Sequence, residues 1–271
     1  MSNNIFFERG QMADKPNNYL WNGDCLELMK DIPDKSIDLI ITDPPYWHKK
    51  SPGKPYAERN PYKTNSKYAN SKLFNVEGEM LTKFSDFRGE DINTLLNEFK
   101  RLMSKMNCYI FCNDVQLAYY GMWAEENKKH FSVLVWEKPL SIINKNRFSQ
   151  HLEYIVRIYD YGTGLNRYDN MSYLYSKVKR YKQNRGNSKL HPTQKPIELI
   201  KELLLVSSKK NDLILDPFTG SGTTLVSCDD LGRRFIGIEL DEKYYKVAKK
   251  RVEKNILLRA NEQQTLFKDK P

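Results

Sequence analysis

Short apolar runs that alternate with amphipathic stretches constrain the fold of this 271-residue chain more than any other feature. The expected strands cover residues 36–42, 108–112, 132–137, 153–159, 212–216 and 234–240. The expected helices cover residues 91–104, 194–208, 222–231 and 241–255. Helices that alternate with buried strands indicate an α/β fold with a doubly wound, mostly parallel sheet.

The first expected strand ends in an unusual way, in the segment DLIITDPPYWHKK. Asp43 follows the apolar residues directly, Pro44 and Pro45 stop the strand, and Tyr46 and Trp47 add two large rings. Asp and Pro are common turn residues, so a plain strand stop is one interpretation. A reaction site at the strand tip is the other.

A second loop, in the segment DLILDPFTGSGTT (residues 212–224), has the composition of a ligand-binding turn. Gly220 and Gly222 permit close approach of the backbone to a ligand, and the next strand ends at Glu239, whose carboxylate can accept hydrogen bonds from ribose hydroxyls. The spacing matches neither the G-x-G-x-x-G dinucleotide fingerprint nor a phosphate-binding P-loop. We therefore predict a nucleoside-cofactor site, with an ordinary glycine turn as the alternative.

Between these two loops lies the segment HPTQKPIELIKELL (residues 191–204). Pro196 stands at a preferred helix start, preceded by Thr193, Gln194 and Lys195. A helix start with an adjacent lysine can bind a carboxylate, although a plain capped helix would have the same sequence.

The positive charge of the chain is concentrated in two stretches. Residues 47–72 hold seven basic residues and one acidic residue, and residues 145–189 hold ten basic and three acidic residues. The chain as a whole carries a net charge of +10, so the remainder is slightly acidic. Tyrosines are interleaved in both stretches, which favours a nucleic acid as the partner.

Together these motifs resemble the β class of amino-type DNA methyltransferases, which methylate exocyclic amines. TDPPYW is similar to their catalytic motif, DPFTGSGTT to their cofactor loop, and HPTQKP to the segment that precedes that loop. The stretch from residue 22 to residue 46 resembles the family's N-terminal block, with Asp24 at the position that meets the cofactor adenine.

The order of the motifs, with the catalytic motif first and the cofactor loop last, is that of the permuted β class. The resemblance implies a Rossmann-like methyltransferase fold and a single catalytic domain over residues 1–271. We expect basic insertions at about 47–80 and 160–190 to recognise DNA, and residues 256–271 to form a polar tail.

The resemblance also implies a reaction, the transfer of a methyl group from S-adenosyl-L-methionine to the N6 amine of a flipped adenine. The Asp43 carboxylate and the Pro44 carbonyl would accept hydrogen bonds from the amine, and Tyr46 would stack on the base. The implied catalytic residues are Asp43, Pro44, Pro45 and Tyr46. The implied cofactor residues are Asp24, Thr193, Lys195, Asp216, Phe218, Gly220, Gly222, Thr223 and Glu239. The expected DNA contacts are Trp47, Lys49, Lys50, Arg167, Lys179, Arg180 and Arg185.

Four alternatives stay open at this point. Cytosine-N4 methylation is the nearest one, and Asp43 favours adenine because the family commonly has Ser there for cytosine. RNA is another alternative substrate. A protein glutamine is a further one, but enzymes of that kind resemble Asn-Pro-Pro-Tyr and lack the large basic insertions of this chain. A catalytically silent DNA-binding subunit would not need both intact motifs.

Other features complete the expectations. We expect no metal, no membrane span and no secretory signal, and reduced cysteines in a cytoplasmic, nucleoid-associated protein. A homodimer is plausible because members of this class often pair. The peptide QQTLF, with Gln263, Leu266 and Phe267, resembles the motif that docks bacterial replication proteins on the sliding clamp.

Overall fold

The computed structural model describes residues 18–46, 87, 89–139, 151–182 and 194–268, with side chains up to Asn261. Its strands are β1 (Tyr19–Asn22), β2 (Leu39–Thr42), β3 (Asn107–Cys112), β4 (His130–Glu137), β5 (Leu152–Tyr159), β6 (Val178–Lys179), β7 (Leu213–Asp216) and β8 (Arg234–Glu239). Its helices are α1 (Cys25–Leu28), α3 (Gly89–Leu102), α4 (Leu117–Glu126), α5 (Ile197–Ser207), α6 (Thr223–Asp230) and α7 (Glu242–Lys268), with 3-10 turns η1 (Met29–Asp31) and η3 (Ser172–Tyr175).

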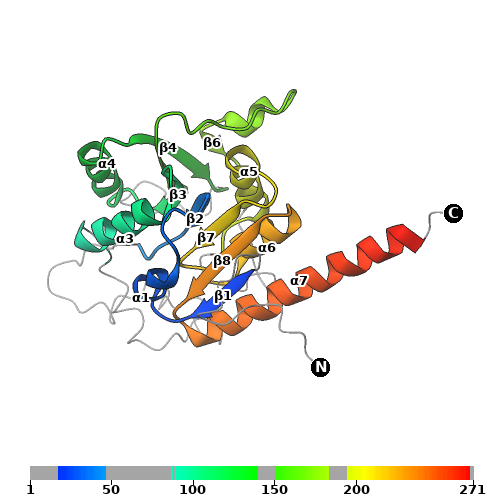
Figure 1. Cartoon of the computed structure of the whole chain (residues 1–271). Coiled ribbons are helices and arrows are strands. Elements are labelled where there is room, and N and C mark those ends of the chain that lie inside the picture. The colour runs from blue at the N-terminus through cyan, green and yellow to red at the C-terminus, as the bar shows by residue number, and fades with distance from the viewer. Residues whose placement is uncertain (1–17, 47–86, 88, 140–150, 183–193, 269–271) are drawn as a thin grey trace, which may run out of the picture.

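The strands form one 8-stranded sheet in the order β1-β8-β7-β2-β3-β5-β4-β6 (Figure 1). β5 runs antiparallel to its neighbours β3 and β4, and the other described strand pairs are parallel. β2 and β7 are neighbours although they come from opposite ends of the chain, with Leu39 opposite Ile214. The mostly parallel, Rossmann-like sheet expected from the sequence is therefore confirmed, and its strands enter in a permuted order.

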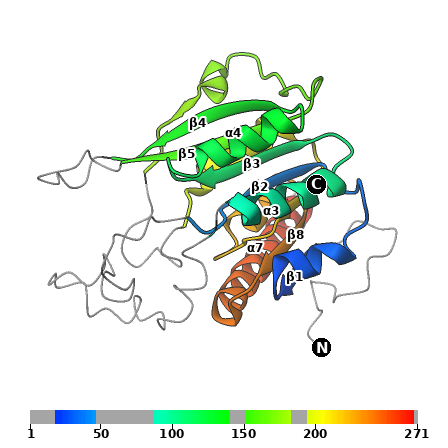
Figure 2. The same ribbon diagram turned by 90° about the vertical axis from the view of Figure 1, so that its left-hand side faces the viewer.

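Helices cover both faces of the sheet (Figures 1 and 2). On one face, α1, α3 and α4 enclose a core that includes Leu96 and Phe99, which lie on the apolar stripe of α3. On the other face, α5, α6 and α7 pack through Leu203, Leu225 and Val252. The two cores hold the sheet rigid, so residues at the tips of the strands have fixed positions.

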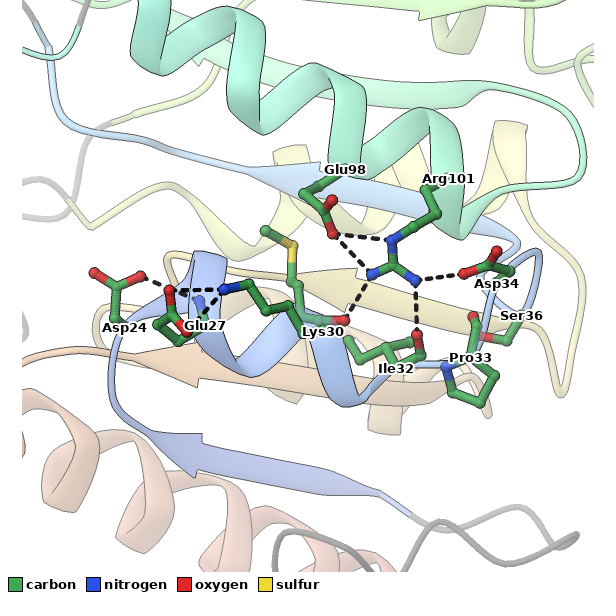
Figure 3. Close-up of polar contacts among 10 residues, drawn as sticks. Asp24, Glu27, Lys30, Ile32, Pro33, Asp34, Ser36, Glu98 and Arg101 are labelled. Carbon is green, nitrogen blue, oxygen red and sulfur yellow. Dashed lines mark hydrogen bonds and ion pairs between the residues drawn. The ribbon is translucent and has the colours of Figure 1, made fainter.

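Arg101 of α3 ties the segment before β2 to the body of the protein (Figure 3). Its guanidinium donates to the carbonyl of Met29 at 2.8 Å and to the carbonyl of Ile32 at 3.1 Å. It also contacts the carboxylates of Asp34 at 2.6 Å and Glu98 at 2.8 Å. These bonds fix the start of the strand whose far end carries Asp43.

All the strands and helices expected from the sequence form, with four additions and one extension. The additions are the short elements β1, β6 and α1 and the helix α4. The sequence of α4, LAYYGMWAEE, has no sharp apolar stripe although Tyr120 and Trp123 are buried. The extension is α7, which continues to Lys268, so the backbone of the expected polar tail is helical up to that residue. Figure 1 shows the end of α7 extending away from the sheet, and Leu257 and Leu258 there are exposed. None of the helices in the described residues has the length and apolar character needed to span a bilayer.

Candidate active site

The two motifs singled out in the sequence meet at one edge of the sheet. Asp43 directly follows β2, and Asp216 is the last residue of the neighbouring strand β7. The Thr42 hydroxyl donates a 2.9 Å hydrogen bond to Asp216 Oδ1 and joins the two strand ends. Because both strands run in the same direction, the catalytic and cofactor motifs lie at their shared carboxyl edge.

Asp43 is part of a buried cluster of charged groups. Its Oδ2 lies 2.5 Å from Lys195 Nζ, which also lies 3.2 Å from the Tyr46 hydroxyl and 3.2 Å from Glu153 Oε2. Lys138 Nζ donates to the other oxygen of Glu153 at 2.5 Å, and the Tyr46 hydroxyl donates to Glu153 at 3.3 Å. Asp43 Oδ1 is buried and has no hydrogen-bond partner among the described residues. A buried acceptor of this kind can bind a donor from a ligand.

The cluster determines the ionisation of its members. Burial raises the pKa of Asp43, and the ammonium of Lys195 opposes that rise. Burial also acts against ionisation of Glu153, but Lys195 and Lys138 outweigh it and lower the pKa of Glu153. Burial disfavours the charged form of Lys195, yet the two carboxylates raise its pKa above the ordinary lysine value. Asp43 is thus a stronger base than an ordinary aspartate, beside a permanently charged lysine.

Gln116 connects the catalytic motif to Phe87, which packs against the cofactor loop. Its buried side-chain amide donates to the carbonyl of Pro45 at 3.1 Å and to the carbonyl of Phe87 at 3.0 Å. The Phe87 ring packs edge-on against Phe218 of the cofactor loop, with centroids 5.9 Å apart. No sequence motif marks Gln116, because only the fold brings it to the prolines.

The acidic residues of the expected cofactor site organise the loop after β7. Asp216 Oδ1 accepts from the backbone N–H of Phe218 at 3.2 Å. Glu239 accepts from the backbone N–H groups of Gly220 at 2.7 Å and Asp241 at 2.9 Å. Burial raises the pKa of Asp216 to about 6 and that of Glu239 to about 7. Glu239 therefore changes charge near neutral pH in the protein without ligand.

Two of the expected cofactor residues face a helix instead. Gly222 has φ of 80°, and a Cβ there would lie 3.2 Å from the Cβ of Ala248 in α7. The Thr223 hydroxyl accepts a 3.0 Å hydrogen bond from Arg251 of α7. α7 therefore packs against this side of the loop, and the contact of Gly222 and Thr223 with the cofactor stays a prediction that rests on their backbone groups.

Asp24 and Thr193 are two further residues of the expected cofactor site. Asp24 is the N-cap of α1, where its carboxylate accepts from the N–H of Leu26 at 2.9 Å (Figure 3). The N–H of Gly23 donates to the Glu239 carbonyl at 3.0 Å. Asp24 follows Gly23 directly and therefore lies next to the tip of β8. Thr193 lies outside the described residues.

Lys195 has other partners in the structure than the ligand carboxylate that was expected from the sequence. It was expected to bind the carboxylate of a ligand at the start of α5. Instead its ammonium lies against Asp43 and Glu153, because these buried carboxylates provide the counter-charges that a buried ammonium requires.

The basic residues expected to contact DNA are also divided by the structure. Lys179 is buried in β6, where it pairs with Glu202, so its prediction as a DNA contact is wrong. Arg180 is exposed and pairs with Glu137 at 2.8 Å, at the same edge of the sheet as Asp43. Trp47, Lys49, Lys50 and Arg185 lie outside the described residues.

Arg167 lies at the opposite edge of the sheet. The backbone of its neighbour Asn166 donates to the carbonyl of Val206 at 2.7 Å, close to the end of α5. α5 starts beside the catalytic cluster, and its 11 residues span about 16 Å at the usual helical rise. Arg167 is therefore remote from Asp43, and its contact with DNA stays a prediction. Within the described residues, no three His, Cys, Asp or Glu side chains gather as a metal-binding group.

Comparisons with known proteins agree with this geometry. The profile of a family described as "DNA methylase" matches residues 37–250. The Type II methyltransferase M.HinfI of Haemophilus influenzae is 32% identical over 257 residues, covering 87% of this chain and 68% of the relative. The Type II methyltransferase M2.LlaDCHI of Lactococcus lactis subsp. cremoris is 30% identical over 264 residues, covering 89% of this chain and 91% of the relative. A crystal structure of an M1.HpyAVI–SAM complex matches with a TM-score of 0.60 and 26% identity over 86% of this chain and 98% of that one.

Proposed function

The chain belongs to the DNA methylase family, and on that premise we propose that it transfers the methyl group of S-adenosyl-L-methionine to the N6 amine of adenine in double-stranded DNA. The observation that carries this proposal is the buried Asp43 Oδ1, which has no partner among the described residues. This acceptor lies at the sheet edge where β7 ends at Asp216 and where β8 ends at Glu239.

The chemistry requires the polarisation of a poor nucleophile. The lone pair of an exocyclic amine is delocalised into the ring, and hydrogen bonds from the amine to Asp43 and to the Pro44 carbonyl would draw the nitrogen toward a tetrahedral shape. S-adenosylmethionine supplies an electrophilic methyl group on a sulfonium, so positioning and electrostatics account for most of the catalysis. Burial raises the pKa of Asp43, which helps this carboxylate to take the proton that the amine releases.

Tyr46 would hold the flipped base. An adenine in a duplex must leave the stack to reach Asp43. Stacking of a base on an aromatic ring contributes about 1–3 kcal/mol. The Tyr46 hydroxyl is held by Glu153 at 3.3 Å and Lys195 at 3.2 Å, so the ring is oriented before a base arrives.

The residues at the ends of β7 and β8 fit a nucleoside cofactor. Glu239 lies at a strand tip, and its carboxylate can bind ribose hydroxyls. Asp24 lies next to this strand tip. Asp216 and Phe218 shape the turn that faces Asp43. Thr193 stays a candidate for the methionine end, whereas Lys195 is engaged by the catalytic carboxylate.

We also propose a domain organisation, a DNA-recognition region and partners for this chain. Residues 1–271 form one catalytic domain, and the insertions at about 47–80 and 160–190 contribute to DNA recognition, with Arg180 as the described residue best placed for it. A cytoplasmic location on DNA, a homodimer and docking on the sliding clamp through residues 263–267 complete the proposal.

The test is the transfer of labelled methyl from S-adenosylmethionine to mixed-sequence DNA, followed by nucleoside analysis. We expect N6-methyladenine. N4-methylcytosine would favour the alternative substrate within the family. Label in neither nucleoside, with an RNA and a protein control, would contradict the proposal and favour a silent DNA-binding subunit.

A further inference from the structure

Four charged side chains alternate in sign from the catalytic acid outward. Asp43 contacts Lys195 at 2.5 Å, Lys195 contacts Glu153 at 3.2 Å, and Glu153 contacts Lys138 at 2.5 Å. Glu153 also accepts a hydrogen bond from the Tyr46 hydroxyl at 3.3 Å. Glu153 therefore contacts both the ammonium that pairs with the catalytic acid and the hydroxyl of the expected stacking ring.

The cluster is shielded from solvent and held by the sheet. The side chains are 6% exposed for Lys195, 15% for Glu153, 18% for Lys138 and 20% for Asp43. Glu153 lies opposite Trp136 in the β4–β5 pair, and the N–H of Lys138 donates to the carbonyl of His151 at 2.8 Å. Two adjacent strands thus fix the carboxylate and its second cation.

We propose that Glu153 is a positioning residue for methyl transfer, which shares Lys195 with Asp43 and anchors the Tyr46 hydroxyl. This inference rests on the proposed function. Because the ammonium of Lys195 bonds to Asp43 Oδ2 and to Glu153, Asp43 Oδ1 is left for the substrate amine.

Loss of the Glu153 charge would change the site in two ways. The ammonium of Lys195 would be neutralised by Asp43 alone, and a carboxylate held by an undivided cation is a weaker acceptor for the amine. The Tyr46 hydroxyl would also lose its charged acceptor, so the ring would be held less firmly.

The pH dependence of the reaction separates this role from a structural one. Lys195, Glu153 and Tyr46 contact Asp43 or its partner, and Cys112, Tyr120 and Asp216 are the other titratable groups that interact with it. The negative charge of Glu153 raises the pKa of Asp43. The rate of methyl transfer should fall at low pH as Asp43 becomes protonated, which gives the pH–rate profile an acid limb. The Glu153→Gln substitution would move this acid limb to lower pH, because Asp43 would stay ionised further into the acid range.

The chain offers a matched control elsewhere. Glu202 of α5 is buried and contacts Lys179 and Tyr181, the same residue types that Glu153 contacts. This second cluster has no member among the groups that interact with Asp43. The Glu202→Gln substitution would thus disturb a similar buried network without reaching the catalytic acid.

The experiment measures single-turnover methyl transfer to DNA between pH 5 and 9, together with calorimetric affinity for S-adenosylmethionine and thermal unfolding. For Glu153→Gln we expect a rate about 10- to 100-fold lower. Its acid limb should lie at lower pH, and its cofactor affinity should be close to that of the wild type. For Glu202→Gln we expect a loss of thermal stability with an unshifted acid limb.

Glu153→Asp keeps the charge and shortens the reach, so it should lower the rate and leave the acid limb near the wild-type position. If Glu153→Gln has the wild-type rate and the wild-type acid limb of the pH–rate profile, the positioning role is overturned. A shift of the acid limb in Glu153→Asp as large as that in Glu153→Gln would also overturn it. If the wild type itself transfers no methyl to DNA, the proposed function fails and this role fails with it.

Discussion

Replacement of Lys195 by methionine separates the sequence interpretation of this residue from the structural one. Methionine keeps an unbranched apolar stem and removes the ammonium that lies 2.5 Å from Asp43 and 3.2 Å from Glu153. Glu153 keeps Lys138 as a counter-charge, whereas Asp43 has no other described cation within ion-pair distance. The substitution therefore leaves one buried carboxylate without a cation.

The magnitude follows from the burial of the pair. The loss of one partner of a buried ion pair costs about 3–5 kcal/mol of unfolding free energy. In a domain of this size that loss lowers the midpoint of thermal unfolding by on the order of 10 °C. The loss should be largest at neutral pH and should shrink as pH falls through the pKa of Asp43, because a protonated carboxyl needs no counter-charge.

Activity should respond in a defined direction. Lys195 lowers the pKa of Asp43, so its removal raises that pKa and moves the acid limb of methyl transfer to higher pH. We expect a shift of about one pH unit or more, opposite in direction to the shift of Glu153→Gln. Affinity for S-adenosylmethionine should change little, because Lys195 binds Asp43 rather than a ligand carboxylate.

The assays are single-turnover rates across pH, calorimetric titration with S-adenosylmethionine, and thermal unfolding. Lys201→Met is the matched control, because Lys201 lies in α5 and forms a partly exposed ion pair with Asp230 at 2.6 Å. An acid limb at the wild-type position, combined with a large loss of cofactor affinity, would refute the structural interpretation and restore the role that was expected from the sequence.

Three further predictions concern the rest of the chain. Gly222→Ala should lower the unfolding free energy by about 1–3 kcal/mol, because of φ at 80° and the contact with Ala248, and cofactor affinity measured at a temperature where the variant is folded should stay near wild type. Affinity for S-adenosylmethionine should rise between pH 5.5 and 8, since ribose hydroxyls favour the charged form of Glu239, whose pKa is about 7 without ligand. Calorimetry should show that binding releases a proton and that Glu239→Gln removes this release. An affinity that does not change with pH in the wild type would contradict this role. The double substitution Leu266→Ala, Phe267→Ala should reduce retention on immobilised sliding clamp, and equal retention would exclude docking through this motif.

The sequence was sufficient for the features that depend on strand ends. Asp43, Asp216 and Glu239 each close an apolar run, and parallel strands bring their carboxyl ends to one edge. The motifs, in their permuted order, therefore predicted that the site lies at this edge of the sheet.

Features that depend on packing across the sheet could not be predicted in this way. Glu153 reaches the catalytic cluster only because β5 is reversed and lies next to β3. Gly222 and Thr223 resemble ligand-binding residues in sequence, and only the fold shows that α7 packs against them. Lys179 lies in a basic stretch, but its side chain is buried against Glu202. Charge and glycine content alone do not indicate which face of an element is covered.

The central claim is that the carboxylate at the tip of β2 activates the target amine without binding the cofactor. Its most direct test is Asp43→Ala, studied by single-turnover methyl transfer to DNA and by calorimetric titration with S-adenosylmethionine. We predict that transfer falls by at least about 100-fold while cofactor affinity remains near that of the wild type. Transfer at the wild-type rate, or a loss of activity that is explained fully by lost cofactor binding, would contradict the claim.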